Sequence, residues 1–226
     1  MNWATSRVAE LCFHGIGVPD RQLEPGEDRF WVDPSTFASI LDAVRDFPSA
    51  TISFDDSNVS DVIYALPGLE RRDLRADFFV IAGRLDQRGS LGCEDVRELG
   101  RRGMRIGSHG MDHVSWRQVR SASSQEREYV LARRMLGDLT GTEVTAAAFP
   151  RGAYDRAAIT TLRALGYEDL RIIDGGASSP DAWLRDRYSV TRFDTAESIA
   201  AYLASPDGGL AGRLQRTVKR GIKRWR

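Results

Sequence analysis

Residues 51–56 read Thr-Ile-Ser-Phe-Asp-Asp, an apolar strand that ends in two adjacent carboxylates. Residues 108–113 read Ser-His-Gly-Met-Asp-His and place two histidines four positions apart. One carboxylate and two imidazoles are ligands that a divalent metal such as zinc takes, and one acid is left over. A site of this kind keeps coordination positions open for water and substrate, so the two stretches together predict a metal-dependent hydrolase.

Strand-like and helix-like segments alternate over the rest of the chain. The predicted strands are residues 8–14, 51–54, 76–81, 104–107, 143–149, 170–173 and 187–191. The predicted helices are residues 35–47, 59–69, 94–102, 124–139, 155–165 and 196–203. Pro34 opens the first of them, and Asp155 caps the helix at 155–165. The helix at 59–69 is expected to break near Pro67 and Gly68. Residues 15–33 are predicted to form a long polar loop. This alternation favours an α/β fold with a parallel sheet, and about seven strands with reactive residues at their carboxyl ends favour closure into a barrel.

The composition is that of an ordinary globular protein, and 226 residues suffice for one domain with a sizeable core. The 32 basic and 32 acidic side chains cancel, which gives no reason to expect a nucleic-acid partner. Cys12 and Cys93 form no disulfide framework. The N-terminus carries charge where a signal peptide would be apolar, and no apolar run approaches the roughly 18 residues of a membrane span. The cytoplasm, with reduced thiols, is therefore the expected compartment.

The carboxyl terminus is basic, whereas acidic and basic residues balance over the whole chain. We therefore expect a catalytic domain at residues 1–207 and a separate basic helix at residues 208–226. After Asp207 the sequence contains basic residues and no acid, and apolar residues recur at helical spacing from Leu210 to Trp225. Such a helix could pack its apolar stripe on the domain. It could equally lie on the anionic inner face of the membrane, with Trp225 at the interface.

Each candidate site residue has an ordinary structural explanation when it is taken alone. Two aspartates after a strand are often helix caps or turn residues, and a His-x-x-x-His pair binds a metal only on a helix or a tight loop. A single histidine at the end of a strand is commonly a structural residue. Taken together, however, the candidates lie at the ends of several strands, which a barrel brings to one rim. They are His14, Asp55, Asp56, His109, His113 and the turn that begins with Pro150 and Arg151.

Three stretches resemble the first three motifs of the polysaccharide deacetylases, also called the NodB-homology domain or carbohydrate esterase family 4. They are Ser-Phe-Asp-Asp-Ser at 53–57, Ser-His-Gly-Met-Asp-His at 108–113 and Phe-Pro-Arg-Gly-Ala-Tyr-Asp at 149–155. The resemblance is greatest to the branch that contains the poly-N-acetylglucosamine deacetylases, because Phe13-His14 stands where that branch has Tyr-His. It extends to about Leu203. It implies a distorted (β/α) barrel, a bound divalent metal and hydrolysis of N-acetyl groups on amino-sugar glycans.

The resemblance also implies a role for each residue of the first two motifs. Asp55 matches the catalytic base, which removes a proton from the attacking water. Asp56, His109 and His113 match the metal ligands. Zinc is the expected metal for this ligand set, and cobalt or nickel would also fit.

Further roles follow from the same resemblance. By analogy with the Tyr-His branch, His14 is the candidate acid that protonates the leaving amine. Arg187 stands where that branch has an arginine that could orient the base. A backbone N–H in the turn formed by Pro150, Arg151 and Gly152 would stabilise the oxyanion of the tetrahedral intermediate.

The sequence departs from the family pattern at several positions. Ser57 replaces a glycine, so the turn would change if a positive φ is needed there. No histidine follows His113, whereas most members take their acid from a histidine near the carboxyl terminus. Arg151 stands in place of an aromatic residue, and Ala148 in place of an arginine. Two alternatives therefore stay open: a degenerate domain that binds glycan or a partner without turnover, and a metal-dependent amidase that acts on a non-acetyl substrate.

The expected substrate is an acetylated amino-sugar glycan or its precursor. Since the expected compartment is cytoplasmic, a lipid-linked or nucleotide-linked amino sugar is one form that this precursor could take. Phe30 and Trp31, in the polar loop at residues 15–33, are candidates to shape the sugar groove, although exposed aromatic residues in loops often only pack locally.

Overall fold

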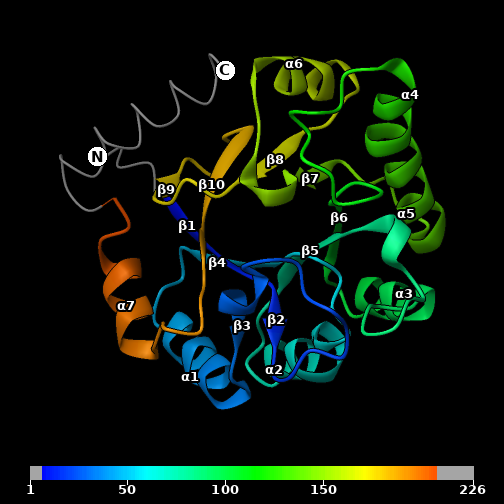
Figure 1. Cartoon of the computed structure of the whole chain (residues 1–226). Coiled ribbons are helices and arrows are strands. Elements are labelled where there is room, and N and C mark those ends of the chain that lie inside the picture. Colours follow the sequence, from blue (N-terminus) through cyan, green and yellow to red (C-terminus); the bar gives the residue numbers. More distant parts are fainter. Residues whose placement is uncertain (1–6, 208–226) are drawn as a thin grey trace.

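Residues 7–207, the part of the chain that the computed structural model describes, form a closed parallel β-barrel surrounded by helices (Figure 1). The strands follow one another around the barrel in chain order: β1 (Val8–Phe13), β4 (Ala50–Phe54), β5 (Ala76–Val80), β6 (Arg105–Ser108), β7 (Ala146–Ala148), β8 (Asp169–Ile172) and β10 (Leu184–Ser189). All of these neighbours pair in parallel, and β10 closes the barrel by pairing with β1. The short β9 (Ala177–Ser178) pairs antiparallel with β1. The predicted barrel of about seven parallel strands is confirmed.

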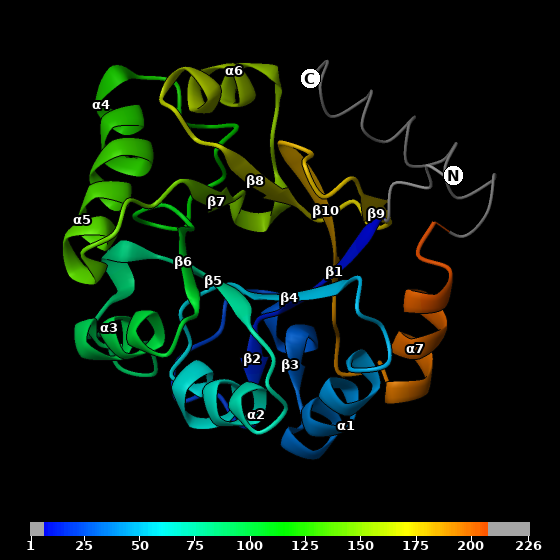
Figure 2. The same cartoon turned by 180° about the vertical axis from the view of Figure 1, so that it is seen from behind.

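Helices cover the outside of the barrel, as two opposite views show (Figures 1 and 2). They are α1 (Pro34–Val44), α2 (Leu66–Glu70), α3 (Cys93–Arg101), α4 (Ala122–Gln125), α5 (Ala132–Thr140), α6 (Arg156–Ala164) and α7 (Ala196–Ala204). The side chain of Asp155 accepts a hydrogen bond from the Ala158 backbone and begins α6, so the predicted cap is confirmed. Within residues 7–207, no helix is both long enough and apolar enough to cross a bilayer. The predicted tail helix at residues 208–226 lies outside the described residues.

The predicted break near Pro67 and Gly68 is instead the start of α2. A π-helical turn, Asp61–Ala65, leads directly into this helix. Pro67 lies in the first turn of α2 and has no N–H to donate to the π-helical turn before it, so the helix continues through this position with one hydrogen bond fewer. A second π-helical turn, Glu126–Leu131, joins α4 to α5 and makes the long helix that was predicted at residues 124–139. Other boundaries shift by a few residues; β10, for example, begins at Leu184 rather than at 187, because its pairing with β8 starts there.

The segment at residues 15–33 is more ordered than a polar loop. It contains β2 (Gly15–Ile16) and β3 (Trp31–Val32), which pair in parallel, and a short 3₁₀ turn, Glu27–Phe30. The pairing depends on glycine, because a Cβ atom on Gly15 would lie 2.2 Å from Cδ2 of Trp31. Trp31 is therefore buried against β2, so of the two alternatives for this residue the structure shows local packing.

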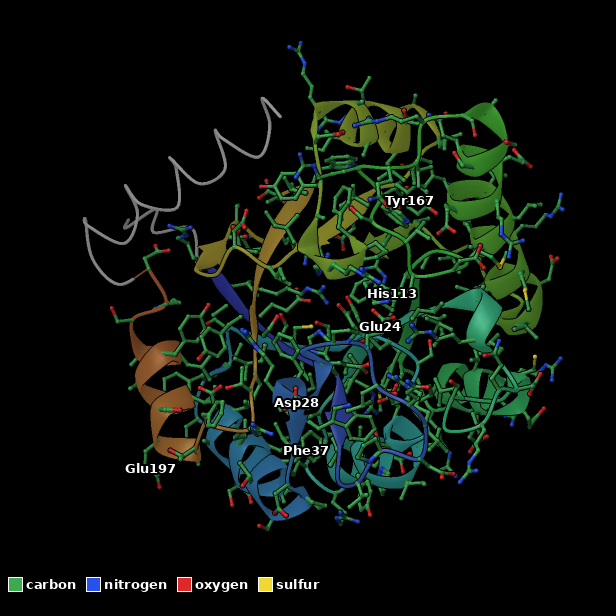
Figure 3. The ribbon with its side chains drawn as sticks, viewed as in Figure 1. Glu24, Asp28, Phe37, His113, Tyr167 and Glu197 are labelled. Atoms are coloured by element: carbon green, nitrogen blue, oxygen red, sulfur yellow. The ribbon has the colours of Figure 1, made fainter. Side chains whose placement is uncertain are left out.

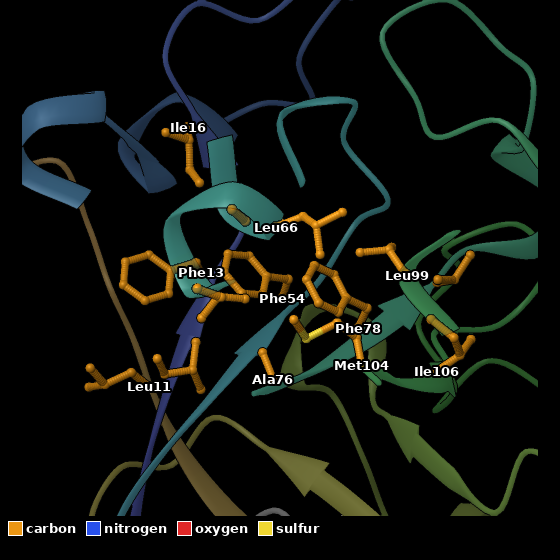
Figure 4. Close-up of a cluster of buried hydrophobic side chains, with 14 of the residues drawn as sticks. Leu11, Phe13, Ile16, Phe54, Leu66, Ala76, Phe78, Leu99, Met104 and Ile106 are labelled. Atoms are coloured by element: carbon orange, nitrogen blue, oxygen red, sulfur yellow. The ribbon is translucent and has the colours of Figure 1, made fainter. Parts of the chain in front are cut away.

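The main apolar core lies between the strands and the surrounding helices, and not inside the barrel (Figure 4). Its centre is a row of aromatic rings from three neighbouring strands. Phe54 stacks on Phe78 with ring centroids 4.7 Å apart, and its other neighbour, Phe13, lies at 5.5 Å. Successive side chains of a strand point to opposite faces. The residues directly before and after each of these aromatic residues along its strand therefore point into the barrel.

The barrel interior is charged rather than apolar. Arg171 is buried there and donates hydrogen bonds to Glu10 at 2.6 Å and to Asp77 at 2.9 Å. Arg187 is also buried. The ring of Phe79 contacts both guanidinium groups, with its centroid 5.7 Å from Cζ of Arg171 and 5.2 Å from Cζ of Arg187. This packing holds Arg187 in place behind the carboxyl ends of the strands, where the predicted site residues lie.

Candidate active site

A cavity of about 440 Å³ opens at the carboxyl ends of the barrel strands. It brings together most of the residues that the sequence singled out. Lining it are His14, Asp55, Asp56, His109, His113, Arg151 and Gly152. Of the remaining two, Pro150 is buried in the same turn as Arg151, and Arg187 lies behind Asp55. The cavity also has walls that were not predicted, among them Glu24 and Ile173.

Asp55 follows β4 and is held by Arg187 of β10. The two terminal nitrogens of Arg187 each donate to a different oxygen of Asp55, at 2.7 Å, and one of them also donates to Oγ of Ser53 at 3.1 Å. Burial alone would favour the neutral acid, but Arg187, followed by His109, lowers the pKa of Asp55 below its usual value. Asp55 is therefore an ionised, oriented carboxylate at the cavity wall.

Asp56, His109 and His113 offer three ligand atoms that lie within 4.8 Å of one another. Oδ1 of Asp56 is 3.5 Å from Nε2 of His109 and 3.2 Å from Nε2 of His113. Nδ1–H of His109 donates to the Ala148 carbonyl at 2.9 Å, and Nδ1–H of His113 donates to Oε1 of Glu24, also at 2.9 Å. With the proton on Nδ1, each ring presents its Nε2 lone pair to the same point.

The donor set fits a divalent cation. Among the residues that the structure describes, none donates an aligned hydrogen bond to the buried Oδ1 of Asp56, which leaves that oxygen to bind a cation. Burial lowers the pKa of His113, which favours the neutral ring that a metal needs. For His109, the nearby carboxylates of Asp55 and Asp56 outweigh burial and raise the pKa.

Ser57, at the glycine position of the motif, has a left-handed backbone conformation. It has φ 58°, and Asp56 before it has φ 74°. A left-handed backbone costs a non-glycine residue about 1 kcal/mol or more. Ser57 offsets part of this cost, because its Oγ accepts a hydrogen bond from the Ile81 backbone N–H at 2.6 Å. Serine thus adopts at this position the positive φ for which a glycine would be favoured.

His14 follows β1 and lines the cavity beside Asp55. Its ring stacks on Phe30, with centroids 4.7 Å apart, and its backbone carbonyl accepts a hydrogen bond from Asn58 at 3.1 Å. Nδ1 of His14 is buried and has no hydrogen-bond partner within the described part of the chain. One nitrogen of this ring lies within 4.8 Å of a carboxylate oxygen of Asp55. The imidazole thus lies beside Asp55, and its Nδ1 is not used in a hydrogen bond within the described residues.

The turn Pro150–Gly152 follows β7. Pro150 has no N–H, and the N–H of Gly152 donates to the Phe149 carbonyl at 2.9 Å. The backbone N–H that this turn can offer an oxyanion is therefore that of Arg151. Arg151 itself has φ 58°, and its guanidinium donates to Glu24 at 2.9 Å.

Two carboxylates of the site were missed at the level of sequence. Glu24, from the segment at residues 15–33, contacts His113, Arg151 and Arg84. Partial burial opposes its ionisation, but the hydrogen bond from His113 and the nearby arginines lower the pKa of Glu24 below its usual value. Nothing local in the sequence marks this residue, because its partners are far away along the chain.

Glu128 is the second missed carboxylate, and it organises the loop between the two histidines. It is buried in the π-helical turn before α5 and accepts hydrogen bonds from the backbone N–H groups of Met111 at 3.0 Å and Asp112 at 3.1 Å. The wide π-helical turn at this functional position is typical of such insertions. Glu128 thus keeps the His109–His113 loop in one conformation.

In sequence, the chain is similar to polysaccharide deacetylases. Residues 43–170 match the profile of the family described as polysaccharide deacetylase. YxkH of Bacillus subtilis (strain 168), a protein provisionally named as a polysaccharide deacetylase, is 23% identical over 156 residues. The match covers 68% of this chain and 56% of YxkH, so the chain spans little more than half the length of this relative.

The structure was compared with solved structures. The deacetylase PplD of Streptococcus pyogenes, solved in complex with acetate, superposes with a TM-score of 0.76 at 20% identity, over 87% of this chain and 98% of PplD. IcaB from Ammonifex degensii superposes with a TM-score of 0.71 at 20% identity, over 88% of this chain and 97% of IcaB. These likenesses confirm the predicted NodB-type barrel. At such identities they concern the fold alone.

Proposed function

The chain belongs to the polysaccharide deacetylase family, and on this premise we propose that it is a metal-dependent hydrolase that removes N-acetyl groups from an amino-sugar glycan or glycan precursor. The main support for the proposal is that a candidate base and a candidate metal site line the same cavity. The ionised carboxylate of Asp55 lies beside three converging ligand atoms, from Asp56, His109 and His113. Amide hydrolysis by water needs both a base for the water and a cation for the carbonyl.

A zinc ion held by Asp56, His109 and His113, or cobalt or nickel in its place, would polarise the acetamide carbonyl and acidify water. Asp55 then takes a proton from the attacking water, and Arg187 keeps this carboxylate oriented. As the carbonyl carbon becomes tetrahedral, the Arg151 N–H donates to its oxygen. When the C–N bond breaks, His14 gives a proton to the departing amine, so that acetate and a free amino sugar result.

The walls of the cavity support a substrate with both apolar and polar faces. Phe30 and Ile173 supply apolar surface, and the rest of the lining is mainly polar or charged. A volume of about 440 Å³ lies within the roughly 300–1,000 Å³ that small-molecule sites occupy. An acetylated amino sugar, whether in a glycan or in a lipid-linked or nucleotide-linked precursor, has this combination of a methyl group, a carbonyl and hydroxyls.

Acetate release tests the proposal directly. Purified protein is loaded with zinc, cobalt or nickel and incubated with N-acetylglucosamine oligomers and with a nucleotide-linked N-acetyl amino sugar. We expect acetate from at least one substrate. The Asp55→Asn variant should release none while it keeps its metal, because Asn retains the shape but not the base. The matched control is Asp20→Asn, which removes an exposed carboxylate that pairs with Arg88 and should leave acetate release unchanged.

The same assay, extended to formyl amides and ring amides, addresses the two alternatives. One observation keeps the non-catalytic alternative in view: the chain has three histidines and none follows His113, so an acid at the usual place is missing. Metal retention without acetate from any substrate would favour a domain that binds glycan without turnover. Hydrolysis of formyl amides or ring amides, but not of acetyl amides, would favour the amidase.

A further inference from the structure

We propose that Glu24 is a positioning residue of the metal site: its carboxylate orients the ligand His113 and ties it to the turn that carries Arg151. The inference rests on the proposed function in one respect, namely that Asp56, His109 and His113 bind a divalent cation. Glu24 and His113 lie together at the mouth of the barrel (Figure 3). They come from distant parts of the sequence, 89 positions apart, and Glu24 precedes the stretches at 53–57, 108–113 and 149–155.

The Glu24 carboxylate has a different partner on each oxygen. Oε1 accepts the Nδ1–H of His113 at 2.9 Å and also a hydrogen bond from Arg84. Oε2 accepts a hydrogen bond from Arg151 at 2.9 Å. Two cations therefore keep the carboxylate charged, and one anionic group connects the loop after β5, the histidine loop and the turn after β7.

His113 depends on this contact more than His109 depends on its own acceptor. Nδ1–H of His109 donates to a main-chain carbonyl, that of Ala148 in β7, which the barrel fixes. His113 lies in a loop and itself has φ 56°, and the acceptor of its Nδ1–H is a side chain, that of Glu24. A carboxylate behind a metal-bound histidine fixes the ring orientation and tautomer and makes the other nitrogen a better ligand. Nε2 of His113 is that other nitrogen, and it faces Asp56 at 3.2 Å.

The alternative is that Glu24 only anchors the segment at residues 15–33, but that segment has other anchors. Arg21 donates to Asn58, outside the segment, at 2.9 Å. Asp20 pairs with Arg88 at 2.7 Å. The β2–β3 pairing holds the two ends of the segment together. Removal of Glu24 should therefore leave the segment folded and act on His113.

The test compares zinc affinity between variants by competition with a chelator. Glu24→Ala should bind zinc about 10–100-fold more weakly than the wild type. Glu24→Gln should lie between them, because its amide oxygen still accepts the Nδ1–H but carries no charge. Asp20→Asn is the matched control, because it removes another carboxylate of the same segment without touching the site, and its affinity should equal that of the wild type. Equal zinc affinity of Glu24→Ala and the wild type would overturn the proposal.

A second readout does not need the metal. The chain has three histidines, so His109→Ala and His113→Ala assign the imidazole N–H protons in NMR spectra of the metal-free protein. We expect a low-field, slowly exchanging proton on Nδ1 of His113 that is lost in Glu24→Ala and kept in Asp20→Asn. An unchanged signal in Glu24→Ala would contradict the contact itself.

Zinc affinity and acetate release, measured together, separate this inference from the proposed function. If the wild type releases acetate while Glu24→Ala keeps full zinc affinity, the positioning role fails and the deacetylase function stands. If Glu24→Ala loses zinc affinity while no acetylated substrate is hydrolysed by the wild type, the positioning role stands and the function fails.

Discussion

Arg187 donates one hydrogen bond to each carboxylate oxygen of Asp55, both at 2.7 Å, and both side chains are buried. The ring of Phe79 lies against the guanidinium, so little water reaches this pair. A charge pair of this kind adds little to stability by itself, because both ions lose their hydration. Breaking it is costly, however, since the remaining partner is left as an unpaired charge in the protein interior.

Arg187→Met should therefore lower the free energy of unfolding by about 3–5 kcal/mol, as removal of one partner of a buried pair does. Methionine fills part of the space, but the Asp55 carboxylate loses both of its charged hydrogen bonds. Urea denaturation of the metal-free protein at neutral pH measures the change.

Two further variants decide whether the pairing itself is responsible. In the double variant Asp55→Asn, Arg187→Met no charge is left behind, so it should be more stable than Arg187→Met alone. Arg88→Met removes an exposed arginine that also pairs with an aspartate, Asp20, and should leave stability unchanged. If Arg187→Met proves as stable as the wild type, the pair does not have the energetic role described here.

His14→Ala should lower the turnover rate by roughly 100-fold or more, the usual scale for a general acid, while zinc content stays at the wild-type level. His14→Phe is the informative companion, because a phenyl ring can keep the stack on Phe30 but has no proton to give. An equal loss in both variants would assign the effect to the proton. Undiminished acetate release in either variant would refute the role of His14 as the acid.

From the basic segment at residues 208–226 we predict that the chain binds anionic membranes. The full chain should sediment with vesicles that contain anionic lipid and not with neutral vesicles, because its basic residues and apolar stripe suit an anionic interface. A chain that ends at Asp207 should stay in the supernatant with both kinds of vesicle. Equal sedimentation of the two chains would show that the segment is not responsible, and no sedimentation of either would favour packing on the domain.

The barrel and most of the site could be predicted from the sequence because they depend on local patterns. Strand and helix periodicity places the elements, and parallel strands carry their carboxyl ends to one rim, so His14, Asp55 and His109 had to lie near one another once the barrel closed. The Asp155 cap is equally local, since it concerns the first turn of one helix.

Glu24 could not be predicted in this way. Its partners His113 and Arg151 lie 89 and 127 positions away, and none of the three belongs to a repeating pattern that would pair them. The burial of Trp31 could not be decided from the sequence for a related reason, because it depends on a ring that covers the Cα of Gly15 and not on the polarity of the surrounding loop. Contacts between side chains of different loops become visible only when the fold places them.

Gly152 gives the sharpest test of the turn after β7. It has φ 58°, and a Cβ atom there would lie 2.1 Å from Cγ1 of Ile173 on the cavity wall. Gly152→Ala therefore adds both backbone strain and overlap, and it should lower the free energy of unfolding by roughly 3 kcal/mol or more. It should also reduce acetate release, because the shift needed to relieve the overlap moves the neighbouring N–H of Arg151.

The variant Gly141→Ala separates the cost of backbone strain from the cost of overlap. It also has a positive φ, 69°, but a Cβ atom there would meet nothing within 4 Å. Gly141→Ala should therefore cost only the backbone strain, about 1 kcal/mol, and leave acetate release unchanged. Thermal and urea unfolding of the two variants measure the difference. If both cost the same, Ile173 yields without penalty, and the close packing of the turn on Ile173 does not hold the Arg151 N–H in position.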